Sequence, residues 1–180
     1  MHRDGLLNLV NTYSPVFSEE KIYRDKILDF IQSHPDCFNR SCSYGHITAS
    51  SFLLSYDGAS ALLMHHSKLN MWLQLGGHCD GDNDVIRVAL KEAQEESGIM
   101  PIKLVRKSIF DIDVHLVPDN DKEHAHYHYD IRFLFRIDDE DAVASKNSES
   151  LELKWFANNI SELPTRERSI VRLFEKWGRL

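Results

Sequence analysis

One segment of this 180-residue chain constrains its fold more than any other, a glycine-rich loop that leads directly into a helix crowded with glutamates. The segment is LGGHCDGDNDVIRVALKEAQEESGI, residues 75–99. It predicts a helix over residues 83–97, with Gly98 placed to end it as a C-cap. At 100° per residue, four apolar side chains share one arc and predict a core-facing stripe: Ile86, Ala89, Leu90 and Ala93.

Three glutamates, Glu92, Glu95 and Glu96, lie within an arc of about 100° on the same helix, beside the apolar stripe rather than opposite it. Like charges this close repel and cost stability. Hard divalent cations such as Mg²⁺ bind carboxylate oxygens, and glycines in the preceding loop, residues 76–82, let backbone groups approach a metal or a phosphate closely. The segment therefore predicts a divalent-metal site.

Short apolar segments on both sides of this helix predict a mixed β-sheet covered by helices, an α/β (α+β) fold. Residues 4–33 have helical periodicity, residues 34–45 have loop composition, and residues 165–177 form an amphipathic helix. Six segments are expected to be strands: His46–Tyr56, Ala61–His66, Met71–Leu75, Leu104–Val117, Tyr127–Ile137 and Leu151–Phe156.

Charge and composition narrow the classes of partner. The chain is 42% hydrophobic and 27% charged, so it should fold, and its net charge of −7 argues against binding nucleic acid polymers or anionic membranes. No apolar run approaches the roughly 20 residues that span a bilayer, and the N-terminus lacks the apolar core of a signal peptide. Three cysteines fit reduced thiols better than a disulfide framework. We expect a cytoplasmic protein.

The segment from Gly77 to Ile99 resembles the Nudix box, G-x5-E-x7-R-E-U-x-E-E-x-G-U, in which U is a bulky apolar residue. A motif of this length is far more specific than a lone glycine pattern. The resemblance implies a Nudix-type α/β/α sandwich with a mixed β-sheet. It implies one domain over residues 1–180, with the Nudix fold over 44–180, the box at 77–99 and an N-terminal helical extension over 1–43.

Three positions depart from the box. Asn83 stands at the position of the first glutamate of the motif, and Lys91 stands at the position of its arginine. The bulky apolar position that follows Glu92 is occupied by the small Ala93. Lysine keeps the charge of arginine but not its planar fork. Three neighbouring carboxylates could substitute for the missing glutamate: Asp80, Asp82 and Asp84.

By resemblance, Glu92, Glu95 and Glu96 bind Mg²⁺ together with the carbonyl group of Gly76, and Mn²⁺ can substitute for Mg²⁺. The implied reaction is hydrolysis of a diphosphate linkage in a nucleoside diphosphate derivative or another small X-O-P-O-P compound. The resemblance also implies a homodimer, by analogy alone.

The resemblance gives catalytic roles to Glu95, Glu96 and Lys91, with the lysine orienting a glutamate. It also implies a further catalytic or metal-binding carboxylate in a loop after the box. Glu149 is our candidate because it directly precedes the strand LELKWF, although the sequence alone does not choose among three glutamates: Glu123, Glu140 and Glu149.

Polar residues around the strand that enters the box are candidate substrate-binding residues: Lys68, Gln74 and His78. The segment HAHYHYD adds a second group, because alternation along a strand places His124, His126, His128 and Asp130 on one face. These imidazoles could bind a transition metal or donate hydrogen bonds to phosphate, and a solvated strand face is the alternative. We expect His126 and His128 to line the substrate cleft, near three further polar residues: Asp111, Asp113 and His115.

Several rival interpretations stay open at the level of sequence. Four potential zinc ligands occur at a spacing that matches no standard site: His34, Cys37, Cys42 and His46. An isopentenyl-diphosphate isomerase shares the Nudix fold and would use a cysteine such as Cys79. A Nudix-fold sensor would bind a nucleotide without cleaving it, and Asn83 and Lys91 keep that alternative open. A protein-interaction domain that binds no magnesium is the third.

Overall fold

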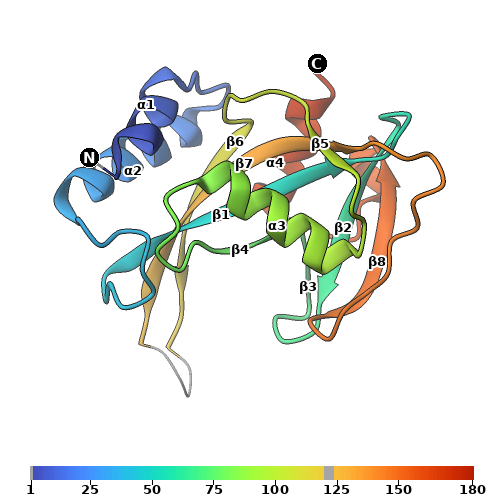
Figure 1. Cartoon of the computed structure of the whole chain (residues 1–180). Helices are drawn as coiled ribbons and strands as arrows, with labels where there is room; N and C mark the ends of the chain where they lie inside the picture. The colour runs from blue at the N-terminus through green and yellow to red at the C-terminus, as the bar shows by residue number, and fades with distance from the viewer. Residues whose placement is uncertain (1, 120–123) are drawn as a thin grey trace.

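The fold is built on one mixed β-sheet of eight strands, which a computed structural model describes for residues 2–119 and 124–180 (Figure 1). Strand β1, Gly45–Leu54, lies at the centre and pairs in parallel with β7, His126–Ile137, over ten positions. β2 and β4 pair with β1, β3 and β8 with β2, and β5 and β6 with β7, all antiparallel. The other strands are β2 (Ser60–His66), β3 (Met71–Leu73), β4 (Leu75–His78), β5 (Ile102–Leu104), β6 (Asp111–Val117) and β8 (Ser150–Ala157).

Helices cover both faces of the sheet, because alternate residues of its strands point to opposite sides. On β1, Ile47, Ala49 and Leu53 join an apolar cluster with helices α1, α2 and α3, whereas Phe52 and Leu54 join a second cluster with α4. The expected α/β/α sandwich is therefore confirmed. The helices are α1 (Asp4–Thr12), α2 (Ser18–Ser33), α3 (Val85–Ser97) and α4 (Arg168–Trp177), with a short 3-10 turn η1 (Ile160–Glu162).

Helix α3 ends where its sequence predicts but begins at Val85, two residues later than expected. Its buried stripe includes Val85 and Val88, whereas Ile86 and Leu90 of the predicted stripe are half-buried. Asp84 caps its N-terminus by accepting a hydrogen bond from the backbone N–H of Arg87 at 3.1 Å. Gly98 ends it in the left-handed conformation, with φ of 70°, where other residues are strained. Ala89 and Ala93 are fully buried against the sheet, and their small size lets the helix approach it closely.

Two strand predictions were wrong in detail. The segment 76–82, expected to be a loop, begins as β4, which extends through His78 and pairs Gly76 with Ser50 and His78 with Thr48. Two glycines carry almost no strand propensity of their own, so pairing with β1 forms this strand. The segment Leu104–Val117, expected to be one strand, forms a strand only over β6, because Leu104 ends β5 and residues 105–110 belong to no strand; both strands pair with β7.

The N-terminal helices pack on the sheet rather than standing apart from it. Leu6 and Val10 of α1 and Ile27 and Phe30 of α2 belong to the same apolar cluster as the strands. The ring of Phe30 stacks on Tyr129 of β7 with centroids 4.0 Å apart. The proposed division at residue 43 stays a prediction. Within the described residues, no helix combines the length and apolarity that crossing a membrane requires.

A buried ionic network attaches α4 to the sheet. Asp111 and Asp113 of β6, which the sequence grouped with the histidines, are buried and accept hydrogen bonds from Arg172 of α4 at 2.9 and 3.1 Å. Arg132 of β7 also donates to Asp111, at 3.2 Å. Lys176 of α4 donates to Asp111 at 3.1 Å. These aspartates are therefore structural, and a solvated strand face is wrong for them.

Candidate active site

The centre of the candidate site is the carboxyl group of Glu96, which lies buried between α3 and β4. Its Oε2 accepts a hydrogen bond from the backbone N–H of Gly76 at 2.8 Å, and the residue is only 4% exposed. Burial raises the pKa of Glu96 to about 8, and the charges of Glu92, Glu149 and Glu95 act in the same direction, while the Gly76 N–H opposes them. Because ionising this carboxyl group is unfavourable, a bound cation would stabilise its ionised form.

Glu92 lies one helical turn earlier, directly against the backbone of Gly77. A Cβ atom on Gly77 would lie 2.6 Å from Oε2 of Glu92, so only glycine leaves room for this carboxylate. Burial raises the pKa of Glu92, the Lys91 charge lowers it, and Glu95 and Glu149 raise it further. Glu92 and Glu96, two of the predicted metal ligands, therefore both lie against the backbone of Gly76 and Gly77.

Lys91 lies between two glutamates, as the resemblance implies for this position of the box. Its Nζ is 3.7 Å from Oε1 of Glu92 and 3.6 Å from Oε2 of Glu95. The side chains of Lys91 and Glu95 are 61% and 57% exposed, so Glu95 faces solvent at the rim of the cluster.

Glu149 also belongs to this cluster, at the end of the connector that precedes β8. Its negative charge raises the pKa of both Glu92 and Glu96, which places its carboxyl group near theirs. Its backbone carbonyl accepts a hydrogen bond from Ser67 N–H at 2.8 Å, in the turn between β2 and β3. Glu140 is exposed in the connector, and Glu123 lies outside the described residues.

These residues fit a hard divalent cation. The donors are carboxylate oxygens with the Gly76 backbone beside them, and they lie on a helix and a paired strand that hold them rigidly. Burial is the main cause of the raised pKa of Glu96, so ionising this carboxyl group has a cost that a bound cation would offset.

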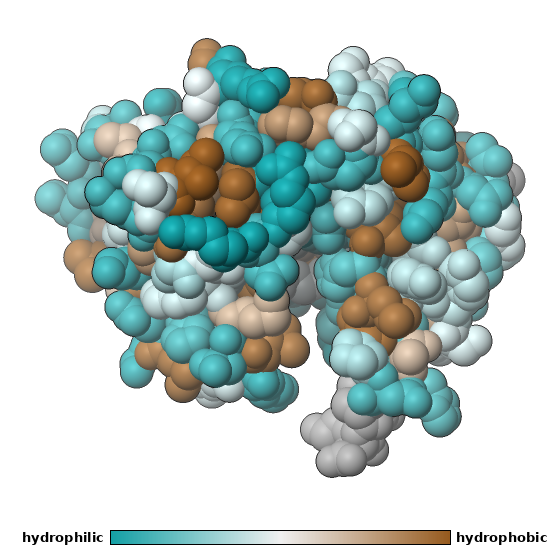
Figure 2. Space-filling model, turned by 180° about the vertical axis from the view of Figure 1, so that it is seen from behind, coloured by the Kyte–Doolittle hydropathy of each residue, from teal (hydrophilic) through white to brown (hydrophobic). Residues whose placement is uncertain are grey.

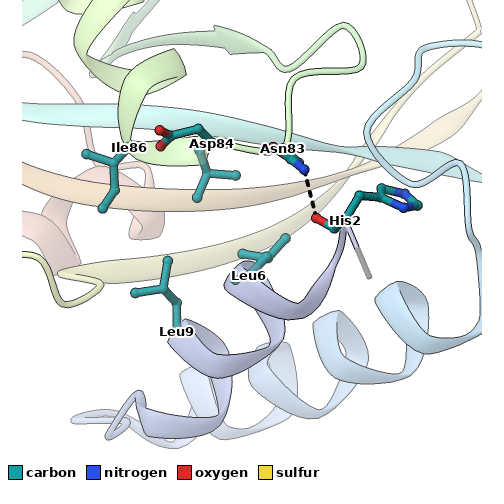
Figure 3. A pocket seen from close by; sticks show the side chains of 8 residues that line it. His2, Leu6, Leu9, Asn83, Asp84 and Ile86 are labelled. Atoms are coloured by element: carbon teal, nitrogen blue, oxygen red, sulfur yellow. Dashed lines mark hydrogen bonds between the residues drawn. The ribbon is translucent and has the colours of Figure 1, made fainter.

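The side chain of Asn83 points toward His2 at the start of the N-terminal helices (Figure 3). Its Nδ2 donates a hydrogen bond of 3.0 Å to the backbone carbonyl of His2, beside a cavity of about 320 Å³ between α1 and the start of α3. The three neighbouring aspartates are each engaged elsewhere. Asp80 pairs with Arg40, Asp82 with Arg87, and Asp84 caps α3.

The candidate substrate residues fall into two groups. Lys68 lies in the exposed turn between β2 and β3, next to the segment of Glu149. Gln74 donates from Nε2 to Ser50 Oγ at 3.2 Å and to Asp130 Oδ2 at 3.1 Å, so its side chain is held against the sheet. From behind, the surface is hollowed between the β2–β3–β8 side of the molecule and the β6–β7 hairpin (Figure 2).

The histidines form a cluster on the side of the sheet opposite α3. The rings of His78 and His128 lie 5.0 Å apart, and Nε2 of His126 is 3.3 Å from Nε2 of His128. The sequence analysis grouped His46 with His34, Cys37 and Cys42 instead, but its ring lies 4.8 Å from that of His128. Parallel pairing of β1 with β7 brings these two residues into register, and nothing local in the sequence indicates that pairing.

The proposed cysteine chemistry has no structural support. Cys37, Cys42 and Cys79 are free and buried. His34 stacks on Phe30 and Tyr44, so it does not complete a site with the first two. Burial raises the pKa of the Cys79 thiol, which makes it a poor acid–base group and disfavours the isomerase.

Comparison with known proteins identifies the fold. No family model and no curated protein matches the chain. A Caenorhabditis elegans Ap4A hydrolase in a binary complex is similar over 74% of this chain and 95% of its own, with 16% identity and a TM-score of 0.59. A MutT protein from Methanosarcina mazei Go1 is similar over 74% and 92%, with 22% identity and a TM-score of 0.52.

A third similar structure, a UDP-X diphosphatase, aligns with 99% of this chain and 92% of its own, at 14% identity and a TM-score of 0.52. Because this alignment extends over nearly the whole chain, it includes the N-terminal helices. The chain therefore has the Nudix fold, which confirms the fold that the box implied.

Proposed function

We propose that this protein is a Mg²⁺-dependent Nudix hydrolase that cleaves a diphosphate linkage in a small compound. One observation carries the proposal: the carboxyl groups of Glu96 and Glu92 lie at the backbone of Gly76 and Gly77, with Lys91 and Glu95 at the rim and the charge of Glu149 acting on both. Clustered carboxylates with a raised pKa at a glycine-rich backbone are the arrangement that a metal-assisted phosphoryl site requires.

The metal would be held by Glu92, Glu95, Glu96 and the carbonyl group of Gly76, and Mn²⁺ can replace Mg²⁺. When bound, it polarises the phosphoryl oxygens, lowers the pKa of a bound water and stabilises the leaving phosphate. In the reaction, the water oxygen forms a bond to phosphorus and the bond from phosphorus to the bridging oxygen breaks.

Other groups of the cluster have separate roles in the reaction. Lys91 holds Glu92 and Glu95 in place through its ammonium group. The N–H of Gly76 fixes the orientation of Glu96. Glu149 is attached to a connector instead of α3, and we assign it the proton that the attacking water loses.

The substrate side of the proposal rests on the polar face of the sheet. Lys68 and Gln74 would contact the phosphates, and His78, His126 and His128 would line the cleft beside them. The similar structures include an Ap4A hydrolase and a UDP-X diphosphatase, so a nucleoside diphosphate derivative is the substrate class that we propose for this chain. A cytoplasmic location and a homodimer complete the proposal, and sedimentation equilibrium tests the dimer.

A turnover screen tests this function. The full chain would be incubated with nucleoside triphosphates, nucleotide sugars, dinucleoside polyphosphates and ADP-ribose, with Mg²⁺ or Mn²⁺, in ¹⁸O-labelled water. We expect metal-dependent cleavage of one class, with the label showing which phosphorus is attacked. The activity should fall by about 100-fold or more in Glu96→Gln and stay unchanged in the matched exposed variant Glu152→Gln.

The sensor is the second candidate, because Asn83 replaces a box carboxylate and turns to the backbone of His2. Binding of a nucleotide by calorimetry, without turnover of any substrate in the panel, would replace the hydrolase with this function.

A further inference from the structure

Five histidines gather on the face of the sheet that does not carry α3, apart from the glutamate cluster. They come from four strands, β1, β4, β6 and β7: His46, His78, His115, His126 and His128. His46, His78 and His128 each offer a ring nitrogen within 4.8 Å of the other two. We propose that these three imidazoles bind a divalent transition metal such as Zn²⁺, at a site distinct from the magnesium site.

Backbone pairing fixes the three residues relative to one another. His46 and His128 are directly paired in the parallel β1–β7 ladder. His78 pairs with Thr48, which lies two residues after His46 on β1. His78 therefore lies diagonally across from His46 on the same face of the sheet. Ligands on three paired strands are pre-positioned, so binding needs only side-chain rotation.

His46 is a buried polar side chain that lacks partners. It is 2% exposed, and neither Nδ1 nor Nε2 has a hydrogen-bond partner among the described residues. A buried polar group left unsatisfied destabilises the fold, so native structures rarely keep one without a reason. A metal ion bound at one of these nitrogens would supply the missing partner.

His126 lies next to the three ligands with a spacing that suits a shared ion. Its Nδ1 is 2.7 Å from the carbonyl oxygen of His124, which fixes the proton on Nδ1 and directs the Nε2 lone pair toward His128. That Nε2 is 3.3 Å from Nε2 of His128. Two nitrogens bound to one tetrahedral ion at about 2.0–2.1 Å lie roughly 3.3–3.4 Å apart, so His126 is placed as a fourth ligand.

The donor chemistry distinguishes this site from the glutamate cluster. Imidazole nitrogens favour zinc, nickel, cobalt, iron and copper, whereas carboxylates favour magnesium and manganese. Burial and the neighbouring histidines lower the pKa of His46 to about 4, and the same causes lower the pKa of His128. Both rings are therefore neutral at pH 7, which is the form that binds a metal ion.

Titration with Co²⁺ tests the site on the full chain after treatment with a chelator. We expect one equivalent to bind with the intense visible absorption of a four- or five-coordinate ion. His46→Gln and His128→Gln should each weaken binding by about tenfold or more. His124→Gln is the matched control, because its side chain is fully exposed on the same segment, and it should bind like the wild type.

One further variant distinguishes this inference from the proposed hydrolase. The intense band should persist in Glu96→Gln, which disables only the magnesium site. A band that disappears in Glu96→Gln, survives in both histidine variants, or is accompanied by cysteine charge-transfer absorption would overturn the proposal.

A measurement on the wild type covers the case in which the histidine variants do not fold. One equivalent of Zn²⁺ should shift the imidazole Cε1–H resonances of His46, His78 and His128, with or without His126, and leave those of the exposed His2 and His124 unmoved. Shifts confined to exposed histidines would refute the site.

Discussion

At the scale of single residues, the surroundings decide which glutamates do chemistry. Glu92, Glu95 and Glu96 share one short segment of helix, yet Glu96 is buried against the backbone of Gly76 while Glu95 is mostly exposed beside Lys91. This burial raises the pKa of Glu96 and of Glu92. The sequence places the three side chains on one arc, and only the packing of α3 on β4 ranks them.

Glu149 provides the first prediction, since its charge acts on both buried glutamates from a separate segment. Replacing it with glutamine keeps its size and removes its charge. We expect kcat to fall by about 100-fold, with little change in KM or in melting temperature. Glu140→Gln, at an exposed position of the same connector, is the matched control for steady-state kinetics. Equal activity of the two variants would remove Glu149 from the mechanism.

At the scale of helices and strands, local periodicity predicts an element correctly where the residues of that element alone determine it. Helix α3 forms within the expected residues because its stripe, Asp84 cap and Gly98 all lie within one segment. Strand β4 and the histidine cluster depend on pairing with β1 instead, and Gly76, Gly77 and His46 show no pattern that indicates it. What the sequence could not predict is the pairing of distant strands.

The two glycines of β4 give the second prediction, because they are crowded by different atoms. A Cβ atom on Gly76 would lie 2.7 Å from Cα of Ser50, which is backbone of the central strand and cannot move aside. A Cβ atom on Gly77 would meet only the carboxylate end of Glu92.

Gly76→Ala should therefore destabilise the protein by about 1–3 kcal/mol, measured by urea unfolding. Gly77→Ala should unfold near the wild-type midpoint but bind Mg²⁺ about tenfold more weakly, measured by calorimetry, because Glu92 is displaced. If Gly77→Ala bound Mg²⁺ like the wild type, Glu92 would not be a ligand.

At the scale of the whole molecule, buried charges join elements that are far apart in the sequence. Arg172 of α4 is fully buried and binds both Asp111 and Asp113 of β6, while Arg132 of β7 binds Asp111. Lys176 extends the network to Glu20 of α2. The network thus connects α4, the sheet and the N-terminal helices.

Arg172→Ala gives the third prediction. Removing one partner leaves two buried carboxylates with too little positive charge, and this should cost about 3–5 kcal/mol in urea unfolding. Arg168→Ala, a neighbour on α4 whose ion pairs are partly exposed, should cost about 1 kcal/mol or less. Similar losses in both variants would show that burial adds little to the Arg172 interactions.

The pH dependence of stability gives the fourth prediction, with the metal removed by a chelator. The pKa of Glu96 is about 8 in the folded protein and about 4.5 for the free side chain, so its contribution is full below 4.5 and is lost as the pH rises through 8. His46 acts in the opposite sense, because its lowered pKa makes its contribution complete above about 6.5 and lost as the pH falls toward 4. Between pH 7 and pH 8, therefore, Glu96 acts and His46 does not.

In that window, the unfolding free energy of the metal-free protein should fall with pH by up to about 1.4 kcal/mol per unit. Glu96→Gln should lack this slope, whereas Glu140→Gln should keep it. Saturating Mg²⁺ should flatten the slope in the wild type, because the ion stabilises the ionised carboxylate that alkaline pH produces. An equal slope in the wild type and in Glu96→Gln, measured by urea unfolding at several pH values, would show that Glu96 ionises normally and would remove the physical reason for a metal at this helix.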